Sequence, residues 1–488
     1  MKNAYIKNLS NTKCDVQLAG QKLMASGDSI GLFTVTWEHT FNDDTLVLGD
    51  AWERSYGDLC FRPVSVNHVA PWYFLTQSGD SVFAVGIKTG ANAFVSFTYT
   101  ANSVTALVDA RCGAAETNLN GRSICLCEFV FKEYGKISAF EAAKDFCRTM
   151  CDKPLLPQKP IYGGNDFYYY YGHSTAETIL QNASFIGEMS KGLENRPYMV
   201  VDDGWETDFC TGPWAANGKF KDMKKLAKNI KNEDVIPGIW ARFLCDKNPI
   251  IPDWWRIERG GKREFLDPSV PDVLDYISQT IGIFRAWGYR MLKHDFSTID
   301  MFGHYGFELT DKITKIDGWH FADTTRTSAE IVKEYYKTIY YSCGNEMTIL
   351  GCNTIPHLIA GLAHCNRIGD DTSGREWART KKMGINTLAY RMVHHNTFYS
   401  ADADCVGTLS VPWEKNVQWL NMLALSGTAL FISCDGDKLS DEMKTDIRNA
   451  FVLASKGEMK LSPLDWGENP TPERWLSDNK EIKFDFGD

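Results

Sequence analysis

Residues 273–295 read VLDYISQTIGIFRAWGYRMLKHD, and this stretch decides the fold. Its first part, Val273–Trp287, has the apolar spacing of a helix, and Ser269 and Pro271 before it favour a helix start. Its second part, Arg290–Asp295, is a short apolar run that ends in charged residues. A helix that leads into a short buried strand is the repeating unit of an α/β barrel.

The same alternation extends from Ile161 towards the C-terminus. It predicts strands at Ile161–Tyr169, Tyr198–Asp202, Ile236–Ala241, Arg290–Asp295, Met347–Cys352, Asn366–Gly369, Val393–Tyr399 and Ala429–Ser433. It predicts helices at Ala176–Met189, Lys219–Lys231, Val273–Trp287, Ser328–Cys343, Trp413–Leu425 and Ser440–Ser455. This is the pattern of a (β/α)8 barrel. The gap between strands five and six is too short for a regular helix, so we expect that unit to be irregular.

The first part of the chain has a different pattern, with short runs rich in Val, Phe, Ile and Thr between Gly, Asn and Asp clusters. The runs are Asp28–Trp37, Ser81–Ile87, Ala93–Thr100 and Ser123–Phe131, followed by a helix at Ser138–Met150 and a proline-rich linker at Lys153–Pro160. We therefore predict a multidomain β and α/β fold: an N-terminal β-sandwich at 1–155, a (β/α)8 TIM barrel at 156–458 and a short C-terminal β region at 459–488.

Composition excludes several classes of partner. The 488 residues are 44% hydrophobic and 23% charged, an ordinary globular balance. A net charge of −10 argues against nucleic acid, and the lack of a long apolar run argues against a membrane span. The N-terminus shows no apolar signal stretch, so we expect a cytoplasmic protein, or a periplasmic or secreted one if a signal was removed. The 14 cysteines form no paired zinc pattern and are expected to be reduced, buried thiols.

Polar residues gather where the predicted barrel strands end. Active-site residues of such barrels lie at these carboxyl ends. The residues found there are Asp202, Asp203, Arg242, Lys293, Asp295, Asn353, Arg367, Asp370, Asp371, Asp402 and Asp404. Paired carboxyl groups are what glycosidic cleavage needs, with one as nucleophile and one as acid/base about 5–5.5 Å away in a retaining enzyme. Strands four and six are near enough for Asp295 and Asp371 to reach that separation.

Other interpretations of these residues stay open. A single aspartate after a strand is commonly a helix cap or turn residue. Asp202 and Asp203 are compatible with a magnesium site, although no acidic residue ends strand three. His394 and His395 are neighbours in a predicted strand, so at most one points inward, and a hydrogen-bonding role is favoured over a metal role. We expect no metal and no cofactor.

At these residues the sequence resembles glycoside hydrolase family 36, the α-galactosidase family, and more distantly family 27. The matching segments are Asp202-Asp203-Gly204-Trp205, Gly238-Ile239-Trp240, Lys293-His294-Asp295-Phe296, Gly351-Cys352 and Arg367-Ile368-Gly369-Asp370-Asp371, with weaker matches at Phe265–Pro268 and Gly49–Asp58. The resemblance covers most of the chain and implies the same three-part layout.

The resemblance also implies roles for individual residues. Asp295 matches the nucleophile, and Asp371, four residues after Arg367, matches the acid/base; Asp370 is the alternative to Asp371. The other matches are to the substrate-binding residues of the family: Asp202 and Asp203 for the 4- and 6-hydroxyls, Lys293 for a hydroxyl, Arg367 near the 2-hydroxyl, Cys352 and Trp240 as pocket walls, Trp205, Gly369 and Phe167 as lining, and Trp52 as an aromatic from the first domain. Lys293 is expected to keep Asp295 ionised, and Asp371 is expected to have a raised pKa.

The resemblance implies a retaining hydrolase that cleaves terminal α-linked galactose, or a galactose-configured sugar, from an oligosaccharide or glycoside. The alternatives are a transglycosylase of the raffinose-synthase type, a hydrolase for β-L-arabinopyranosides or α-N-acetylgalactosaminides, and a non-catalytic carbohydrate-binding protein on the same fold. Relatives are often oligomeric, so a homo-oligomer is compatible with the resemblance.

Overall fold

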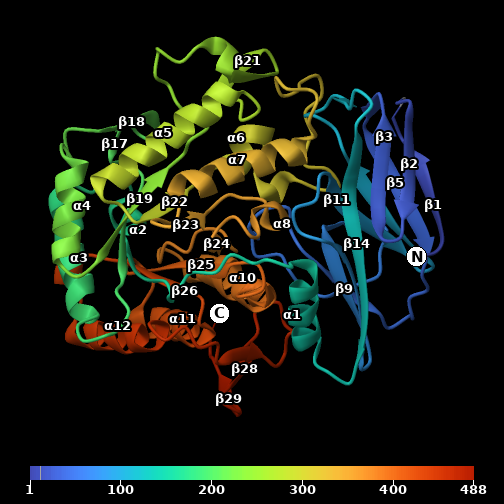
Figure 1. The fold of residues 1–488 in the computed structure, drawn as a ribbon. Coiled ribbons are helices and arrows are strands. Elements are labelled where there is room, and N and C mark those ends of the chain that lie inside the picture. The colour runs from blue at the N-terminus through green and yellow to red at the C-terminus, as the bar shows by residue number, and fades with distance from the viewer. Residues whose placement is uncertain (11, 488) are drawn as a thin grey trace.

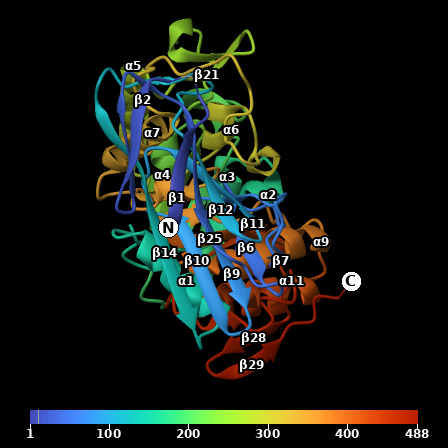
Figure 2. The ribbon, with the colours of Figure 1, turned by 90° about the vertical axis from the view of Figure 1, so that its right-hand side faces the viewer.

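The first part of the chain is a sandwich of two antiparallel sheets. In the computed structural model, which describes residues 1–10 and 12–487, the sandwich forms one side of the molecule (Figures 1 and 2). Its two sheets pack through aromatic side chains. The Trp37 ring lies 6.4 Å from Phe97 in its own sheet and 5.9 Å from Phe129 in the other. One sheet holds β1 (Lys2–Asn8), β5 (Leu32–Glu38), β12 (Ser103–Asp109), β11 (Phe94–Thr100) and β8 (Ala70–Pro71). The other holds β2 (Cys14–Ala19), β3 (Lys22–Gly27), β14 (Ser123–Gly135), β10 (Ser81–Ile87), β9 (Tyr73–Ser78), β6 (Leu46–Gly49) and β7 (Arg62–Pro63).

Eight parallel strands close into a barrel, as predicted. In spatial order they are β15 (Tyr162–Asn165), β16 (Tyr198–Val201), β19 (Ile236–Ala241), β22 (Met291–His294), β23 (Thr348–Gly351), β24 (Cys365–Arg367), β25 (Ser400–Gly407) and β26 (Ala429–Ser433). The main helices that cover it are α3 (Ala176–Met189), α4 (Met223–Asn232), α5 (Pro271–Trp287), α7 (Ser328–Cys343), α11 (Trp413–Ser426) and α12 (Asp441–Ala454) (Figure 1).

The unit α5–β22 shows how the sequence builds this barrel. Pro271 occupies the first turn of α5, where its missing N–H costs nothing, and Gly288 ends the helix in the left-handed region at φ 103°. Val273, Ile277 and Ile281 lie on the buried face of α5. All four residues of β22 are buried, so Asp295 follows a strand that is held on both faces.

Strand seven was predicted wrongly at Val393–Tyr399. The chain there continues from α10 (Thr387–Arg391) through the short helix η4 (Met392–His394), and the strand is β25 (Ser400–Gly407). Local hydrogen bonds explain the difference, because the amides of Thr397 and Phe398 donate to the His394 carbonyl. The first strand is also shorter than predicted: it ends at Asn165, and Phe167 begins the one-turn helix α2 (Phe167–Tyr170). The β23–β24 connection holds only α8 (Pro356–Ile359), so its irregularity is confirmed.

The C-terminal region is a small three-stranded sheet, β27 (Leu461–Pro463), β28 (Arg474–Ser477) and β29 (Lys480–Lys483). The Trp466 indole before β28 stacks on Tyr390 and meets Phe140 of α1 (Ala139–Met150). This region therefore packs against both the barrel and the helix that follows the sandwich. The domain limits at 155/156 and 458/459 stay predictions.

The sandwich docks on the barrel through segment Gly49–Asp58. Its backbone pairs with the barrel at Ser55 and Gly369, where the Ser55 amide donates to the Ile368 carbonyl and the Asp370 amide donates to Ser55. Over the described residues all fourteen cysteines are free. No helix in that same part of the chain has the length and apolar character needed to cross a membrane.

Candidate active site

The predicted site residues come together at the carboxyl ends of the barrel strands. Asp202 and Asp203 follow β16, Lys293 lies in β22 and Asp295 directly follows it. A second group comes from the next two strands of the barrel: Cys352 follows β23, Arg367 ends β24, and Gly369, Asp370 and Asp371 follow β24. Because the strands are parallel, these residues all face one mouth of the barrel.

Asp295 is a buried carboxylate held in one orientation. The Trp240 indole N–H lies 3.2 Å from Asp295 Oδ2, and the Phe296 amide donates to Oδ1 at 2.8 Å. Burial acts to raise the pKa of Asp295, but the charges of Lys293 and Arg54 outweigh it and the pKa lies below its usual range. Asp295 is thus held in the ionised form that was expected for it, and the neighbouring Cys352 also acts to lower its pKa.

Asp371 lies between two arginines. Arg367 Nη2 is 3.0 Å and Arg54 Nη1 is 3.4 Å from Asp371 Oδ1. Burial acts to raise the pKa of Asp371, but Arg54 and Arg367 outweigh it and lower the pKa. The raised pKa predicted for Asp371 is therefore wrong, because the docked sandwich places the Arg54 charge beside this carboxylate.

Asp295 and Asp371 are joined through shared partners. Arg54 Nη1 lies 3.6 Å from Cys352 Sγ and 3.4 Å from Asp371, while Cys352 is near enough to Asp295 to act on its pKa. The same Arg54 charge acts on both carboxylates. The two therefore face one small polar cluster. Asp370 is turned to the opposite side of Arg54, at 2.6 Å from Nη2, and also pairs with Arg379 at 2.6 Å.

Asp202 forms a buried ion pair with Lys293. Lys293 Nζ lies 2.6 Å from Asp202 Oδ2, and Asn165 donates to the same oxygen at 2.7 Å. Burial acts to lower the pKa of Lys293, but Asp202 outweighs it and the pKa lies well above its usual range. Behind the pair, the Asp202 amide donates to Asp166, whose pKa rises to about 7 through burial and the nearby Asp202 charge.

Arg367 is fixed by residues of strand seven. It forms an ion pair of 2.9 Å with Asp404, and its Nε donates to the Gly369 carbonyl at 3.2 Å. Tyr168 donates to Asp404 at 2.6 Å, which orients that carboxylate. Asp402 accepts the Asp404 amide at 2.8 Å. Asp404 thus supports Arg367 from behind, so its part in the site is indirect.

The aromatic residues take different places. The Trp240 indole contacts Asp295. Trp205 lies behind Trp240 and donates its indole N–H to the Trp240 carbonyl at 2.9 Å. Trp52 is 2% exposed and donates to Thr310 at the contact of sandwich and barrel. Phe167 is half-buried beside Tyr171. His294 points to the helix α7, and burial lowers its pKa to about 4.

Sequence reasoning missed two charged residues of the site, Arg54 and Glu206. Glu206 opens the hairpin β17 (Glu206–Asp208)–β18 (Thr211–Ala216) and lies beside Asp203. Its signal was its place directly after the Asp202–Trp205 motif. Arg54 gave no comparable signal, because it is one of two adjacent charged residues in the mixed segment Trp52-Glu53-Arg54-Ser55-Tyr56.

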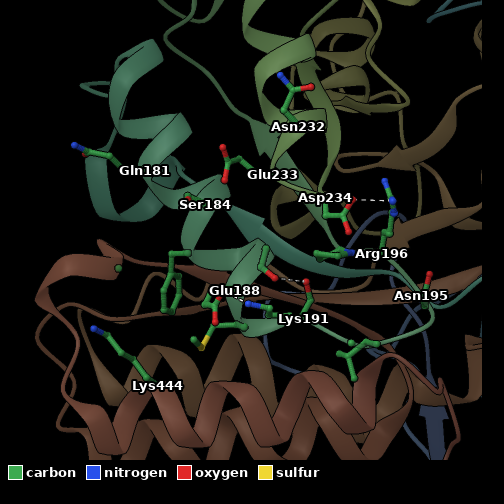
Figure 3. Close-up of a pocket in the computed structure, with 18 of the residues that line it drawn as sticks. Gln181, Ser184, Glu188, Lys191, Asn195, Arg196, Asn232, Glu233, Asp234 and Lys444 are labelled. Carbon is green, nitrogen blue, oxygen red and sulfur yellow. Dashed lines mark hydrogen bonds and ion pairs between the residues drawn. The ribbon is translucent and has the colours of Figure 1, made fainter.

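Hollows elsewhere are distinct from this mouth. One of about 1020 Å³ lies by the segments that precede β16 and β19, at the opposite end of the barrel (Figure 3). Two ion pairs line it, Glu188 with Lys191 at 3.6 Å and Asp234 with Arg196 at 2.7 Å. Across the described ranges, 1–10 and 12–487, no group of three or more His, Cys, Asp or Glu side chains could hold a metal ion.

Several solved structures with a similar fold are α-galactosidases. TtGalA from Thermus thermophilus, in complex with p-nitrophenyl α-D-galactopyranoside, is 15% identical with a TM-score of 0.64, covering 98% of this chain and 96% of its own. A variant of the GH36 α-galactosidase AgaA from Geobacillus stearothermophilus, in complex with stachyose, is 14% identical with a TM-score of 0.58, covering 97% and 76%. No family model matches the chain. At these identities the likeness concerns the fold.

Proposed function

We propose that this chain is a retaining glycoside hydrolase that releases terminal α-linked galactose or a galactose-configured sugar. The observation that carries the proposal is the Asp295–Cys352–Arg54–Asp371 cluster, which gathers two carboxylates at the mouth of the barrel. It is supported by the fold shared with α-galactosidases whose structures hold galactosides. The sugar identity rests on the Asp202–Asp203 motif.

In this mechanism the ionised Asp295 attacks the anomeric carbon while Asp371 gives a proton to the departing oxygen. Lys293 and Arg54 keep Asp295 anionic before attack. When Asp295 becomes an ester its charge is lost, and Asp371 then takes a proton from the attacking water. Because the arginines hold Asp371 ionised in the free site, we expect productive binding to take up a proton.

The direct test is turnover of nitrophenyl glycosides that differ at C2, C4 and C6. Preference for the α-galactoside over the arabinopyranoside and N-acetylgalactosaminide, unchanged by chelator, supports the proposal. Transfer to excess acceptor sugar, seen in the products, would indicate the transglycosylase. Sugar binding without turnover of any of these glycosides would contradict the proposal and indicate a non-catalytic carbohydrate-binding protein.

Asp371→Ala is expected to slow the cleavage of poor leaving groups much more than that of good ones. Without the acid, natural galactosides should lose about 10²–10⁴-fold in kcat/KM, whereas nitrophenyl galactoside, which leaves without protonation, should lose far less. Steady-state kinetics on both substrates measures the ratio. Asp370→Ala is the matched variant, and equal losses on both substrates in Asp371→Ala would contradict the acid/base assignment.

Arg54→Met is expected to raise the pKa of Asp371. Since Arg54 is the strongest charge that lowers this pKa, its removal should let Asp371 keep its proton to higher pH, and the alkaline limb of kcat/KM should move up by about one pH unit or more. The exposed Arg62→Met serves as the control within the same region of the sandwich. An unmoved limb in Arg54→Met would show that Asp371 does not govern it.

A further inference from the structure

Asp203 and Glu206 form a buried acidic pair at the edge of the site. They are 5% and 1% exposed, and the Cys210 amide donates to both, at 2.9 Å to Asp203 Oδ1 and 2.8 Å to Glu206 Oε1. The Gly204 amide donates to Glu206 Oε2 at 3.1 Å, and a hydrogen bond links the two carboxyl groups. Both side chains are therefore held by the turn of one hairpin.

The cations around the pair are engaged elsewhere. Lys293 pairs with Asp202 at 2.6 Å, and Arg242 Nη2 pairs with Asp300 at 2.6 Å. Arg242 Nη1 reaches only Cys210 Sγ, at 3.3 Å. In the part of the chain that the structure describes, neither Asp203 nor Glu206 has an ion pair.

The other charged neighbours are anions, namely Asp202 and, beyond the Cys210 thiol, Asp295. Two touching carboxyl groups that are buried without a cation cannot both be ionised at modest energetic cost. One proton must therefore stay between them. Burial first, and Glu206 next, raise the pKa of Asp203 to about 9.

We infer that Asp203 and Glu206 share one proton, and that Glu206 through this proton is a positioning residue for the sugar-binding carboxyl of Asp203. The inference rests on the proposed function, because it concerns how the sugar is held. The two aspartates of the Asp202–Asp203 motif then differ in their electrostatics. Asp202 forms an ion pair with Lys293, whereas Asp203 and Glu206 together carry one negative charge. When the proton leaves above about pH 9, the two carboxylates repel and Asp203 loses its position.

The test compares Glu206→Gln with Glu206→Ala. The glutamine amide still donates to an ionised Asp203, so KM at pH 7 should stay within about threefold and its rise above pH 9 should disappear. Alanine removes the partner carboxyl and leaves Asp203 with the Cys210 amide, so KM should rise about tenfold or more while kcat changes less. Equal KM values in the two variants at pH 7, or an unchanged alkaline rise in Glu206→Gln, would overturn the positioning role.

An infrared measurement separates this inference from the proposed function. The difference spectrum between pH 7 and pH 10.5 should show, besides the signal of Asp166 with its pKa of about 7, a protonated-carboxyl stretch in the unaltered protein that Glu206→Gln lacks. Its absence from the unaltered protein would overturn the shared proton whatever the enzyme hydrolyses. A present stretch in a protein that turns over no glycoside would uphold the shared proton and sink the proposed function instead.

Discussion

Asp295→Ala is expected to lower kcat/KM by at least about 10⁴-fold while the protein stays folded. The change removes the carboxylate that would form the glycosyl ester, and the second proposed catalytic carboxylate, Asp371, is held by Arg54 and Arg367. The fold should persist because Asp295 lies after β22 and outside the barrel ladder. Kinetics on nitrophenyl α-galactoside and a thermal melt measure the two effects.

Rescue by azide tests the nucleophile role of Asp295 more directly than the loss of activity does. In Asp295→Ala a small anion fits where the carboxylate was, so added azide should restore turnover and give the β-galactosyl azide, identified by NMR. Asp208→Ala, which removes an exposed carboxylate of β17 near the mouth, is the matched control and should keep its full rate. Near-normal turnover in Asp295→Ala without azide would refute the nucleophile.

Arg391→Met is expected to lower the free energy of unfolding by about 3–5 kcal/mol, because it strands a buried charge. Arg391 and Asp50 are 0% and 1% exposed and form two bonds, of 2.7 and 2.9 Å. Trp72 donates to the same carboxylate at 2.8 Å, and Arg391 also holds the Ile368 carbonyl at 3.0 Å. Methionine fills the space but leaves Asp50 without its cation.

Chemical denaturation with a matched pair of variants tests this. Arg474→Met breaks the half-exposed Arg474–Glu481 pair of 2.8 Å and should cost less than about 1 kcal/mol. Asp50→Asn combined with Arg391→Met should recover part of the loss, since no lone charge is then buried. A loss under about 1 kcal/mol in Arg391→Met would mean that water reaches Asp50.

The barrel was predictable where hydrophobic periodicity alone determines an element. β19, β26, α3 and α7 lie at the predicted residues because each is an unbroken apolar strand or a helix with a clear buried face. Strand seven was not, because β25 carries Asp402 and Asp404 into the barrel interior, while the preceding Val393–Tyr399 holds Val, Thr, Phe and Tyr, which favour strands. Tertiary partners such as Arg367, which forms an ion pair with Asp404, stabilise these buried aspartates.

The site was predictable as a set of strand ends and not as an electrostatic arrangement. The motif residues meet because parallel strands end together. The ionisation of Asp371 depends on Arg54, which is 317 positions away in the sequence and contacts it only after the sandwich docks. The pairing of Glu206 with Asp203 likewise depends on a hairpin turn, which brings the Cys210 amide to both carboxyl groups.

The backbone pairing of Ser55 with Gly369 couples docking of the sandwich to the position of the loop that carries Asp370 and Asp371. A fragment that holds only the barrel should therefore lack the proposed activity, because the seam beside Asp370 and Asp371 would open to water. Chimaeras that exchange the sandwich with a relative must carry segment Gly49–Asp58 with its matching barrel loop. Amide exchange at Ser55 and Asp370 should slow and quicken together, which gives a catalysis-independent gauge of whether such a chimaera has assembled.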